Sequence, residues 1–380
     1  MKRIFFLFAL AVYTSAAFAG TRQETYATDI VLTNELKIAR TAEVVEIPYS
    51  RVATRIGAIK NGAFRVVNRR GEEVPHQLVY KGQSTPQALL VQVSIPASGS
   101  LQLAIVPGTP KAVVAKTFGR YVPERADDFA WENDKVAFRM YGKALEAKPS
   151  ENANGMDVWA KRTSALVINK WYKLGNYHKD NGEGLDYYHV GYTLGAGNIA
   201  PMNADTIVYP KNYRNYKILD SGALRISFEL SYDNWNVGGT PVTVVKRFTL
   251  DAGSQMNKVE AQFSYDGNKA LPVAVGIIRR AEPGTILLNE KEGIMGYWEP
   301  QHGDDGTIGA GCIFTTPVKQ MGTDKVHLLT VSSTTSSAPF VYYNGAAWNK
   351  AGAVTNDQQW FTYLQEYAAK IKSPVRTDVK

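Results

Sequence analysis

The sequence predicts an all-β protein in which a small antiparallel β-sandwich precedes a larger one and a single helix closes the chain. Short segments rich in β-branched residues, many of them alternating between apolar and polar positions, recur along most of the 380 residues. Gly, Pro or Asn closes each of these segments, as expected for strands joined by turns. The exception is the tail WFTYLQEYAAKIK, residues 360–372, whose apolar residues follow helical spacing.

The amino terminus has the composition of a secretory signal peptide. Lys2 and Arg3 precede an apolar run at residues 4–12, and the motif AFA that ends at Ala19 is a small-x-small cleavage site. The run is shorter than the roughly 20 residues that span a bilayer, and no cysteine follows the cleavage site as in a lipoprotein. We therefore expect a signal peptide at residues 1–19 and a periplasmic or secreted mature protein without a membrane anchor.

The first sandwich is predicted within residues 20–112. Its expected strands are EVVEIPYSRV, FRVVNRRGEEV, LLVQVSIPA and LQLAIVPG. The sequence PGTP at 107–110 follows them, and two prolines in four residues interrupt both helix and sheet. That segment is the expected domain boundary.

The second domain is predicted to occupy residues 113–380. Long alternating strands are typical of a large sandwich with a concave, solvent-lined sheet. The tail helix ends with Lys370 and Lys372, which suit the negative end of the helix dipole. The expected strands are KVAFRMYG, SALVINKWY, ALRISFELSYD, VTVVKRFTL, KVEAQFSYD, PVAVGIIRR, HLLTVSS and PFVYYNG.

Composition excludes several classes of function. The one cysteine, Cys312, allows no internal disulfide, and the chain has no Gly-rich phosphate loop, G-x-S-x-G elbow, H-E-x-x-H motif or cysteine pair for zinc. The net charge is +8, but the basic residues are dispersed, which argues against a nucleic-acid-binding arm. An exported basic protein suits an acidic polysaccharide partner, although simple solubility explains the same charge.

The segment NYHKDNGEGLDYYHVGYTLGAG, residues 176–197, is the main candidate site. Tyr177, His178, Tyr188 and His189 can donate and accept protons, and loops held by a rigid sheet often carry function. An alternative is that the glycines only build turns while the tyrosines cap a core. A second alternative is a bound zinc or calcium ion, for which the candidate ligands are His178, Asp180, Glu183 and Asp186.

Clusters of aromatic and cationic side chains suggest a saccharide groove elsewhere in the chain. Arg279 and Arg280 end an apolar strand, where bidentate hydrogen bonds to a carboxylate are favourable. Each cluster taken alone is explained by packing, but their repetition favours sugar binding. Counting the candidate loop, the residues assigned to substrate binding are Trp159, Lys170, Tyr177, Glu183, Arg279, Trp298 and His302.

The charged segment at residues 118–142 has two interpretations. One is a salt-bridged turn that docks one domain on the other. The other is a carboxylate pair for glycoside hydrolysis, made by Asp127 with Glu132 or Asp134, because that reaction needs an acid and a base on either side of the sugar bond.

Four of these segments together resemble the domain-of-unknown-function 4861 family: PERADDFAWENDKVAFRMYG, MDVWAKR, the loop at 176–197 and LDAGSQMNKVEAQF. This is a family of exported bacterial proteins found with polysaccharide-degradation enzymes, including a dehydratase of ulvan oligosaccharides. The resemblance implies a galactose-mutarotase-like β-supersandwich behind a small β-sandwich. It also implies uronic-acid-containing oligosaccharides as substrates and a β-elimination that leaves a 4,5-unsaturated sugar.

The chemistry of such an elimination assigns roles to residues. A cation must neutralise the carboxylate, a base must take the C5 proton, and an acid must protonate the departing oxygen. We expect His178 as the base, Tyr188 as the acid, and Arg280 supported by Lys161 as the carboxylate clamp, with His189 or His302 in reserve. No cofactor is expected, and the oligomeric state is not predicted. Glycoside hydrolysis, sugar mutarotation or epimerisation, and glycan binding without catalysis remain alternatives.

Overall fold

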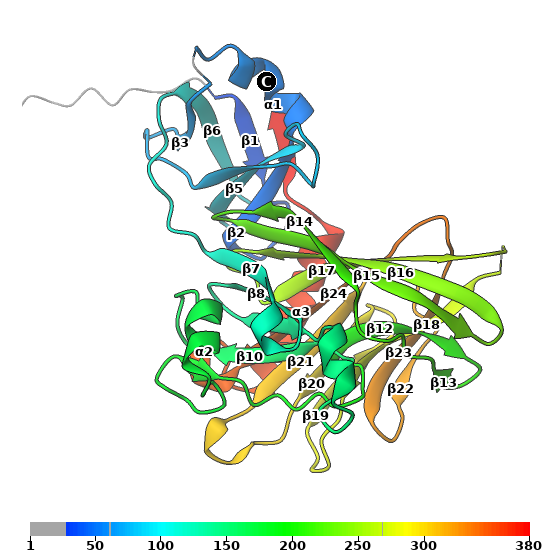
Figure 1. Cartoon of the computed structure of the whole chain (residues 1–380). Coiled ribbons are helices and arrows are strands. Elements are labelled where there is room, and N and C mark those ends of the chain that lie inside the picture. Colours follow the sequence, from blue (N-terminus) through cyan, green and yellow to red (C-terminus); the bar gives the residue numbers. More distant parts are fainter. Residues whose placement is uncertain (1–27, 61, 268) are drawn as a thin grey trace, which may run out of the picture.

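The computed structural model describes residues 28–60, 62–267 and 269–380, which form two packed β-structures and a long carboxyl-terminal helix (Figure 1). The predicted all-β class with a terminal helix is confirmed. The predicted signal peptide at residues 1–19 lies outside the described residues. None of the described helices is long and apolar enough to cross a membrane.

The amino-terminal sandwich contains one sheet ordered β25-β1-β6-β3 and another ordered β2-β5-β4. Inward-facing residues such as Ile47, Val66 and Leu89 are fully buried between the sheets. The bounds are β1 Ile30–Thr33, β2 Arg40–Pro48, β3 Phe64–Asn68, β4 His76–Val79, β5 Ala88–Ile95, β6 Ser100–Pro107 and β25 Arg376–Val379.

One predicted strand of this sandwich is partly wrong. The segment EVVEIPYSRV leaves the sheet at Pro48 and becomes helix α1, Tyr49–Gly57. Val52 and Ile56, four residues apart, lie on one face of that helix and are buried against the sandwich. Proline supplies no N–H to a strand ladder but is tolerated at a helix start, where the N–H would be unpaired.

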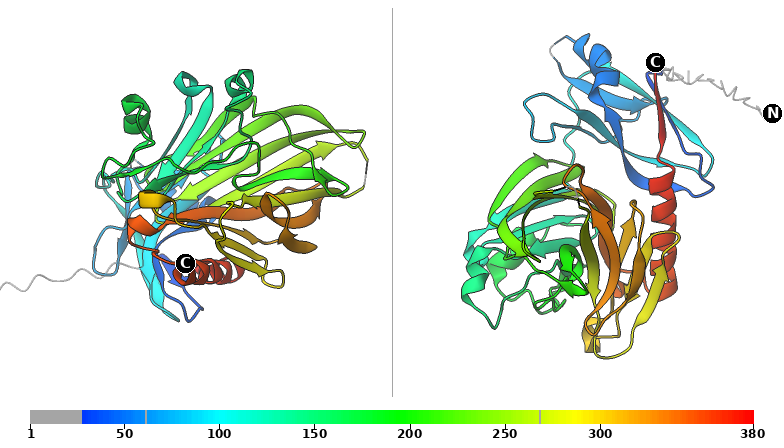
Figure 2. Two further views of the ribbon diagram at one scale, coloured as in Figure 1. Left: turned by 90° about the horizontal axis from the view of Figure 1, so that it is seen from below. Right: turned by 90° about the vertical axis from the view of Figure 1, so that its right-hand side faces the viewer.

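The chain returns to its beginning at the carboxyl terminus. Strand β25 pairs antiparallel with β1, so that Ile30 faces Val379 and Thr33 faces Arg376. Figure 2 shows this last strand running from the long helix up into the amino-terminal sandwich. The pairing fixes the two β-structures relative to each other at a second point besides the 107–117 connection.

The larger part is a supersandwich with an eight-stranded sheet on one side, ordered β14-β15-β16-β17-β24-β21-β20-β19. Two five-stranded sheets, β11-β10-β9-β8-β7 and β13-β12-β18-β23-β22, face it across one continuous apolar core. The bounds are β7 Thr117–Val122, β8 Asp128–Asn133, β9 Ala137–Met140, β10 Asp157–Lys161, β11 Gly184–Leu185, β12 Ala196–Asn203, β13 Thr206–Ile207, β14 Asn215–Ser221, β15 Arg225–Val237, β16 Thr240–Asp251, β17 Met256–Tyr265, β18 Leu271–Ile278, β19 Thr285–Asn289, β20 Ile294–Trp298, β21 Ile308–Phe314, β22 Gln320–Thr323, β23 His327–Thr334 and β24 Phe340–Trp348.

Helix α3, Asp357–Lys372, confirms the predicted tail helix and packs on the outer face of the eight-stranded sheet (Figure 2). The Asn356 side chain caps it by accepting a hydrogen bond from the Gln359 N–H. Trp360 and Leu364 are fully buried against β20 and β21. A Cβ at Gly311 would lie 2.7 Å from Leu364, which explains why the strand beneath the helix carries glycine.

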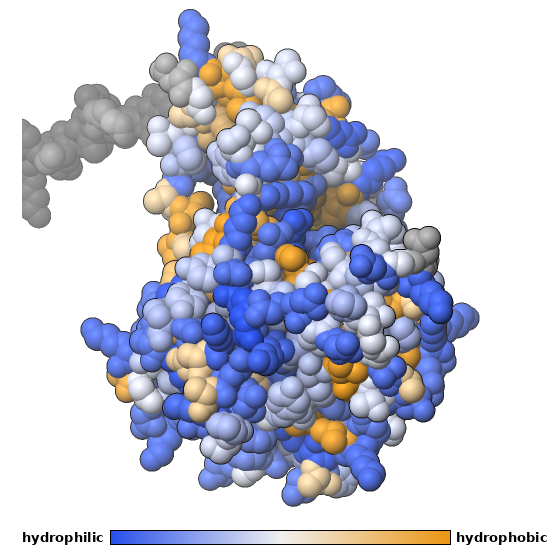
Figure 3. Space-filling view, turned by 45° about the vertical axis from the view of Figure 1, so that its right-hand side comes forward, coloured by the Kyte–Doolittle hydropathy of each residue, from blue (hydrophilic) through white to orange (hydrophobic). Residues whose placement is uncertain are grey.

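On the face shown in Figure 3, hydrophilic residues dominate and apolar ones form small scattered patches. Single apolar residues scattered over a surface are normal in folded proteins.

Lys246 on β16 occupies a core-facing position in VTVVKRFTL and is fully buried. Its Nζ donates hydrogen bonds to Asn198 Oδ1 at 2.7 Å and Ile199 O at 2.9 Å. Burial lowers the pKa of Lys246 to about 7. Between that pH and the ordinary lysine pKa of about 10.4, the unfolded chain binds more protons than the folded one, so stability rises with pH.

We therefore expect the unfolding free energy of the native protein to rise more steeply with pH than that of Lys246→Met. The slope for the native protein should exceed the slope for the variant by up to about 1.4 kcal/mol per pH unit between about pH 7 and pH 9. Urea denaturation of both proteins at those two pH values measures it. Equal slopes would contradict the lowered pKa.

Candidate functional site

The face of the β7–β11 sheet that points away from the common core carries charged residues, although it is not exposed to water. Strand alternation turns Phe129 and Trp131 of β8 into the common core, and Asp128 and Glu132 to the other side. The segment between β10 and β12, including helix α2, Ile168–Leu174, covers that side. The charged groups are therefore buried beneath the loop at residues 176–197.

Arg139 is the centre of one buried cluster. Its Nη2 lies 2.9 Å from Asp186 Oδ2 and forms an ion pair with Asp157, while Nη1 lies 3.8 Å from Asp128 Oδ2. Tyr141 donates a hydrogen bond of 3.1 Å to Asp157. Burial raises the pKa of Asp186 to about 8 and that of Asp128 to about 6, against the opposing effect of the arginine.

Lys161 is the centre of a second buried pair, so its predicted role in clamping a substrate is wrong. Its Nζ donates to Glu132 Oε2 at 2.6 Å and to Asn133 O at 2.7 Å, and burial lowers the pKa of this lysine. Glu132 also accepts the backbone N–H groups of Val167 and Ile168. The lysine is therefore a structural partner of a buried carboxylate and has no access to a ligand.

Contacts in this region overturn one further prediction and argue against one of the two interpretations of the segment at 118–142. The segment SALVINKWY was expected to be a strand, but α2 begins at Ile168, where Glu132 receives the first helical N–H groups. Asp127 and Asp134 do not form a hydrolytic pair with Glu132. Asp127 accepts from the Tyr121 hydroxyl, and Asp134 accepts from the Gly253 N–H at 2.6 Å.

Trp159 and Tyr177 are packed inside the structure and cannot stack on a sugar as predicted. Trp159 is 0% exposed and lies between Trp171, with ring centroids 5.4 Å apart, and Tyr177, at 5.1 Å. Tyr177 is 8% exposed. The MDVWAKR and NKWYK clusters are thus one aromatic core beneath the loop, which was the packing alternative.

His178 lies on the outside of the same loop with a side chain that is 62% exposed. Its Nδ1 is 2.8 Å from Asp186 O. Close to it on the surface, Lys170 pairs with Glu183 at 2.8 Å, and Asp180 pairs with Arg162. Among the described residues no three His, Cys, Asp or Glu side chains gather to hold a metal ion.

Gly184 is one glycine of this loop that a larger residue could not replace without a backbone clash. It pairs with Lys161 at a φ of +127°, and a Cβ there would lie 1.9 Å from Ala160 O.

We expect Gly184→Ala to lower the unfolding free energy by about 1–3 kcal/mol, as measured in urea, because strand β11 would have to leave β10. Gly182→Ala is the matched control, since a Cβ at Gly182 would meet nothing within 4 Å; an equal loss in both would contradict the close approach.

Three of the predicted residues meet in a pocket of about 170 Å³ at the ends of β18 and β20. Arg280, His189 and His302 line it, together with Tyr187 and Glu299, and Arg280 stands 4.6 Å above the ring of Tyr188. The remaining residues that line the pocket are Ala281, Glu282, Pro300 and Gln301. His178 does not line this pocket.

Arg280 is held in place by its neighbours. Its Nε donates to Glu299 Oε1 at 2.7 Å and its Nη1 donates to His189 O at 2.6 Å. Nη2 makes no hydrogen bond to any residue that the structure describes. A guanidinium that is fixed on one side and unpaired at Nη2 is well arranged to bind a carboxylate.

The pocket also contains groups suited to proton transfer. Burial raises the pKa of Glu299 to about 7, with Arg280 opposing that rise. Burial likewise raises the pKa of the Tyr187 phenol. The hydroxyls of Tyr187 and Tyr188 are buried and have no hydrogen-bond partner among the residues that the structure describes. Tyr187 stacks on His302 with centroids 5.3 Å apart, and His302 Nδ1 lies 3.0 Å from Asp305.

Two predicted binding residues lie apart from this pocket. Arg279 donates to the backbone carbonyl of Asp324 at 3.0 Å. Trp298 packs against the residues beneath helix α3. Both are neighbours of pocket residues in sequence, but alternation along the chain turns adjacent side chains to opposite faces.

Sequence reasoning missed the Arg139 cluster and the pairing of Glu299 with Arg280. A signal for the first was present, because Arg139 and Asp157 interrupt otherwise apolar strands, where an unpaired charge is too costly to bury. No sequence signal pairs Glu299 with Arg280, since they follow strands of different sheets.

Residues 32–377 match the model of a family described as Domain of unknown function (DUF4861). The uncharacterized protein P7 of Formosa agariphila is 28% identical over 409 residues, which cover 99% of this chain and 98% of that protein.

A solved protein in the glycosyl hydrolase family 38 from Enterococcus faecalis has a TM-score of 0.50 at 11% identity, over 93% of this chain and 47% of that one. An alpha-mannosidase from Enterococcus faecalis V583 has a TM-score of 0.45 at 8% identity, over 93% and 46%. The chain spans about half the length of these two structures, and the first shows a shared fold.

Proposed function

The chain belongs to the domain-of-unknown-function 4861 family, and from that premise we propose that it is a carbohydrate-active enzyme, a carbon–oxygen lyase that dehydrates oligosaccharides ending in a uronic acid. The observation that carries the proposal is the pocket of Arg280. One cation, two histidines, a buried tyrosine and a carboxylate with a pKa near neutrality line about 170 Å³. Elimination next to a carboxylate needs a cation, a base and an acid, and these side chains can supply all three.

Arg280 is the proposed carboxylate clamp. A uronate ionises poorly at C5 because its own negative charge opposes a second one, and a guanidinium bound to the carboxylate stabilises the charge that develops there. Glu299 has a pKa of about 7 and can take up a proton when the substrate carboxylate arrives. Arg280 is then shared with the substrate at little electrostatic cost.

His189 is the proposed base and Tyr187 the proposed acid, in place of His178 and Tyr188. His189 is exposed and lines the pocket, whereas Tyr188 lies beneath Arg280 and supports it. The histidine takes the C5 proton, the electron pair forms the C4–C5 double bond, and the C4 oxygen leaves as water with a proton from Tyr187. Because the pKa of Tyr187 is raised, its phenol is protonated at neutral pH.

The test uses the mature chain and oligosaccharides that carry different uronates at the non-reducing end. Dehydration is expected to give the near-ultraviolet absorbance of an unsaturated uronate and a product lighter by one water in mass spectrometry. An absorbance rise with chain cleavage would indicate a polysaccharide lyase instead. Absence of any rise across uronates differing in epimer and linkage would overturn the elimination.

Glycoside hydrolysis is the second candidate, favoured by the raised pKa of Glu299, which is typical of a general acid. Glu282 lines the same pocket and could serve as the second carboxylate. Hydrolysis would release saturated sugars in the same experiment. Tight binding without any product would indicate a glycan-binding protein.

A further inference from the structure

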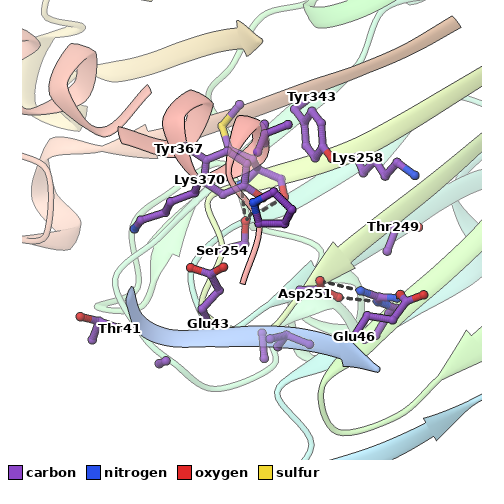
Figure 4. A pocket seen from close by; sticks show the side chains of 18 of the residues that line it. Thr41, Glu43, Glu46, Thr249, Asp251, Ser254, Lys258, Tyr343, Tyr367 and Lys370 are labelled. Atoms are coloured by element: carbon purple, nitrogen blue, oxygen red, sulfur yellow. Dashed lines mark hydrogen bonds and ion pairs between the residues drawn. The ribbon is translucent and has the colours of Figure 1, made fainter. Parts of the chain in front are cut away.

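A larger cavity, of about 400 Å³, lies between the amino-terminal sandwich and the supersandwich (Figure 4). Strand β2, the ends of β16 and β17 with the turn between them, and helix α3 form most of its walls, to which Arg225 of β15 and Tyr343 of β24 also contribute. It shares no residue with the pocket of Arg280. Ligand pockets of this size occur preferentially at domain boundaries.

The two β-structures are fastened to each other around this groove. Arg225 on β15 binds Asp251 through Nε at 2.6 Å and also forms an ion pair with Glu46 on β2. Gln92 of β5 donates to Ala252 O at 3.2 Å across the same boundary. The walls are therefore held in position before any ligand arrives.

Tyrosine rings make one wall. Tyr343 of β24 and Tyr367 of α3 meet edge to face with centroids 5.9 Å apart, and Tyr363 lies beside Tyr367 at 5.8 Å. The Tyr363 hydroxyl accepts a hydrogen bond of 3.0 Å from the Gln255 N–H, which fixes its ring. All three are partly exposed in the groove. Such faces pack against the C–H groups of a pyranose with little loss of side-chain entropy.

The charges of the groove balance. Its lining contains three acidic residues, Glu43, Glu46 and Asp251, and three basic ones, Arg225, Lys258 and Lys370. Five of the six are paired: Arg225 with Glu46 and Asp251, Glu43 with Arg40 at 2.5 Å, and Lys258 with Glu260 at 3.1 Å. Lys370 makes no hydrogen bond or ion pair with the described residues, and Figure 4 shows it at the edge of the groove across from Glu43. A hydroxylated ligand without net charge suits this lining better than an anion.

We propose that this groove binds a neutral saccharide segment at a site separate from the Arg280 pocket. That the ligand is a sugar rests on the proposed function; that it is uncharged rests on the balanced lining. Pyranose rings stack on Tyr343 and Tyr367, while Lys370 and Glu43 hydrogen-bond to the hydroxyls. The groove then holds a glycan to the enzyme independently of the elimination.

The test measures binding of neutral hexasaccharides of glucose, xylose and mannose by calorimetry. We expect at least one to bind the native protein and Arg280→Lys equally, and to bind Lys370→Ala about tenfold more weakly, because a charge-assisted hydrogen bond is lost. Tyr343→Phe should keep the affinity and Tyr343→Ala should lose it. Lys370 is at the rim, so its variant stays informative if Tyr343→Ala misfolds.

Two results would overturn the proposal. One is binding that Lys370→Ala leaves unchanged and Arg280→Lys abolishes, which would place the glycan in the catalytic pocket. The other is no binding of any of the three hexasaccharides. A negative elimination assay together with groove binding that depends on Lys370 would refute the proposed reaction and leave the groove assignment standing.

Discussion

Arg280→Lys is expected to lower kcat/KM on a uronate oligosaccharide by about 10²–10³-fold. Lysine keeps the charge but replaces a planar fork by a single ammonium group. It cannot hold Glu299 Oε1 and His189 O, as Arg280 does at 2.7 and 2.6 Å, and still reach the substrate carboxylate. The initial rate of unsaturated-product formation, measured at several substrate concentrations, gives the value.

Arg279→Lys is the matched control, because the same substitution is made one residue away. The Arg279 side chain bonds to the backbone of Asp324 and does not line the pocket. We expect it to change kcat/KM by less than about threefold. Similar losses of kcat/KM in both variants would show that the substitutions disturbed the end of strand β18 and not the binding of the substrate carboxylate. An unchanged rate in Arg280→Lys would show that Arg280 takes no part in the reaction.

Arg139→Met is expected to lower the unfolding free energy by about 3–5 kcal/mol near neutral pH. The variant leaves Asp128, Asp157 and Asp186 buried around an uncharged side chain, without the cation that partly offsets their desolvation. Urea denaturation followed by tryptophan fluorescence measures the change. Arg247→Met is the control, because Arg247 is 43% exposed and pairs with Glu229 at the surface; its loss should stay below about 1 kcal/mol.

The loss in Arg139→Met should also depend on pH. In the native protein the folded-state pKa values of Asp128, about 6, and Asp186, about 8, lie above the ordinary value of about 3.9. The folded state therefore binds more protons between those values, and their contribution to stability falls as pH rises from about 4 to 8. Removing the arginine raises both pKa values further, so the variant should lose less at about pH 5 than at about pH 8. The same loss at both pH values would contradict the account of the cluster.

Local sequence was sufficient for the long strands β15, β16 and β17 and for the tail helix, whereas strands such as β8, β12 and β21 were not predicted. In VTVVKRFTL the alternation predicts β16 and also which face each residue takes, yet it places Lys246 on the core face, where an isolated ammonium would not be stable. The partners that make this possible, Asn198 and Ile199, belong to β12 in the opposite sheet. The same pattern thus predicts a strand and leaves the environment of its lysine open.

Helices α1 and α2 show the opposite case. Val52 and Ile56 were present at helical spacing, but a β-rich segment precedes them and Pro48 alone marks the change. In SALVINKWY the β-branched residues favour a strand, and the carboxylate of Glu132, some 35 residues earlier, receives the N–H groups that begin the helix instead. Tertiary contact overrides propensity here because a buried carboxylate needs donors.

By itself, the sequence determined the periodicity of the long strands and the tail helix, and it pointed to the loop at 176–197, of which Tyr187 and His189 line the pocket of Arg280. The tertiary structure decided which charges are buried together and which stay near water. Arg139 meets aspartates from β8, β10 and the loop, and Arg280 meets Glu299 from another sheet. Alternation is a local property that sets the face of each side chain, whereas sheet pairing over long separations decides which face loses water and which charge becomes its partner.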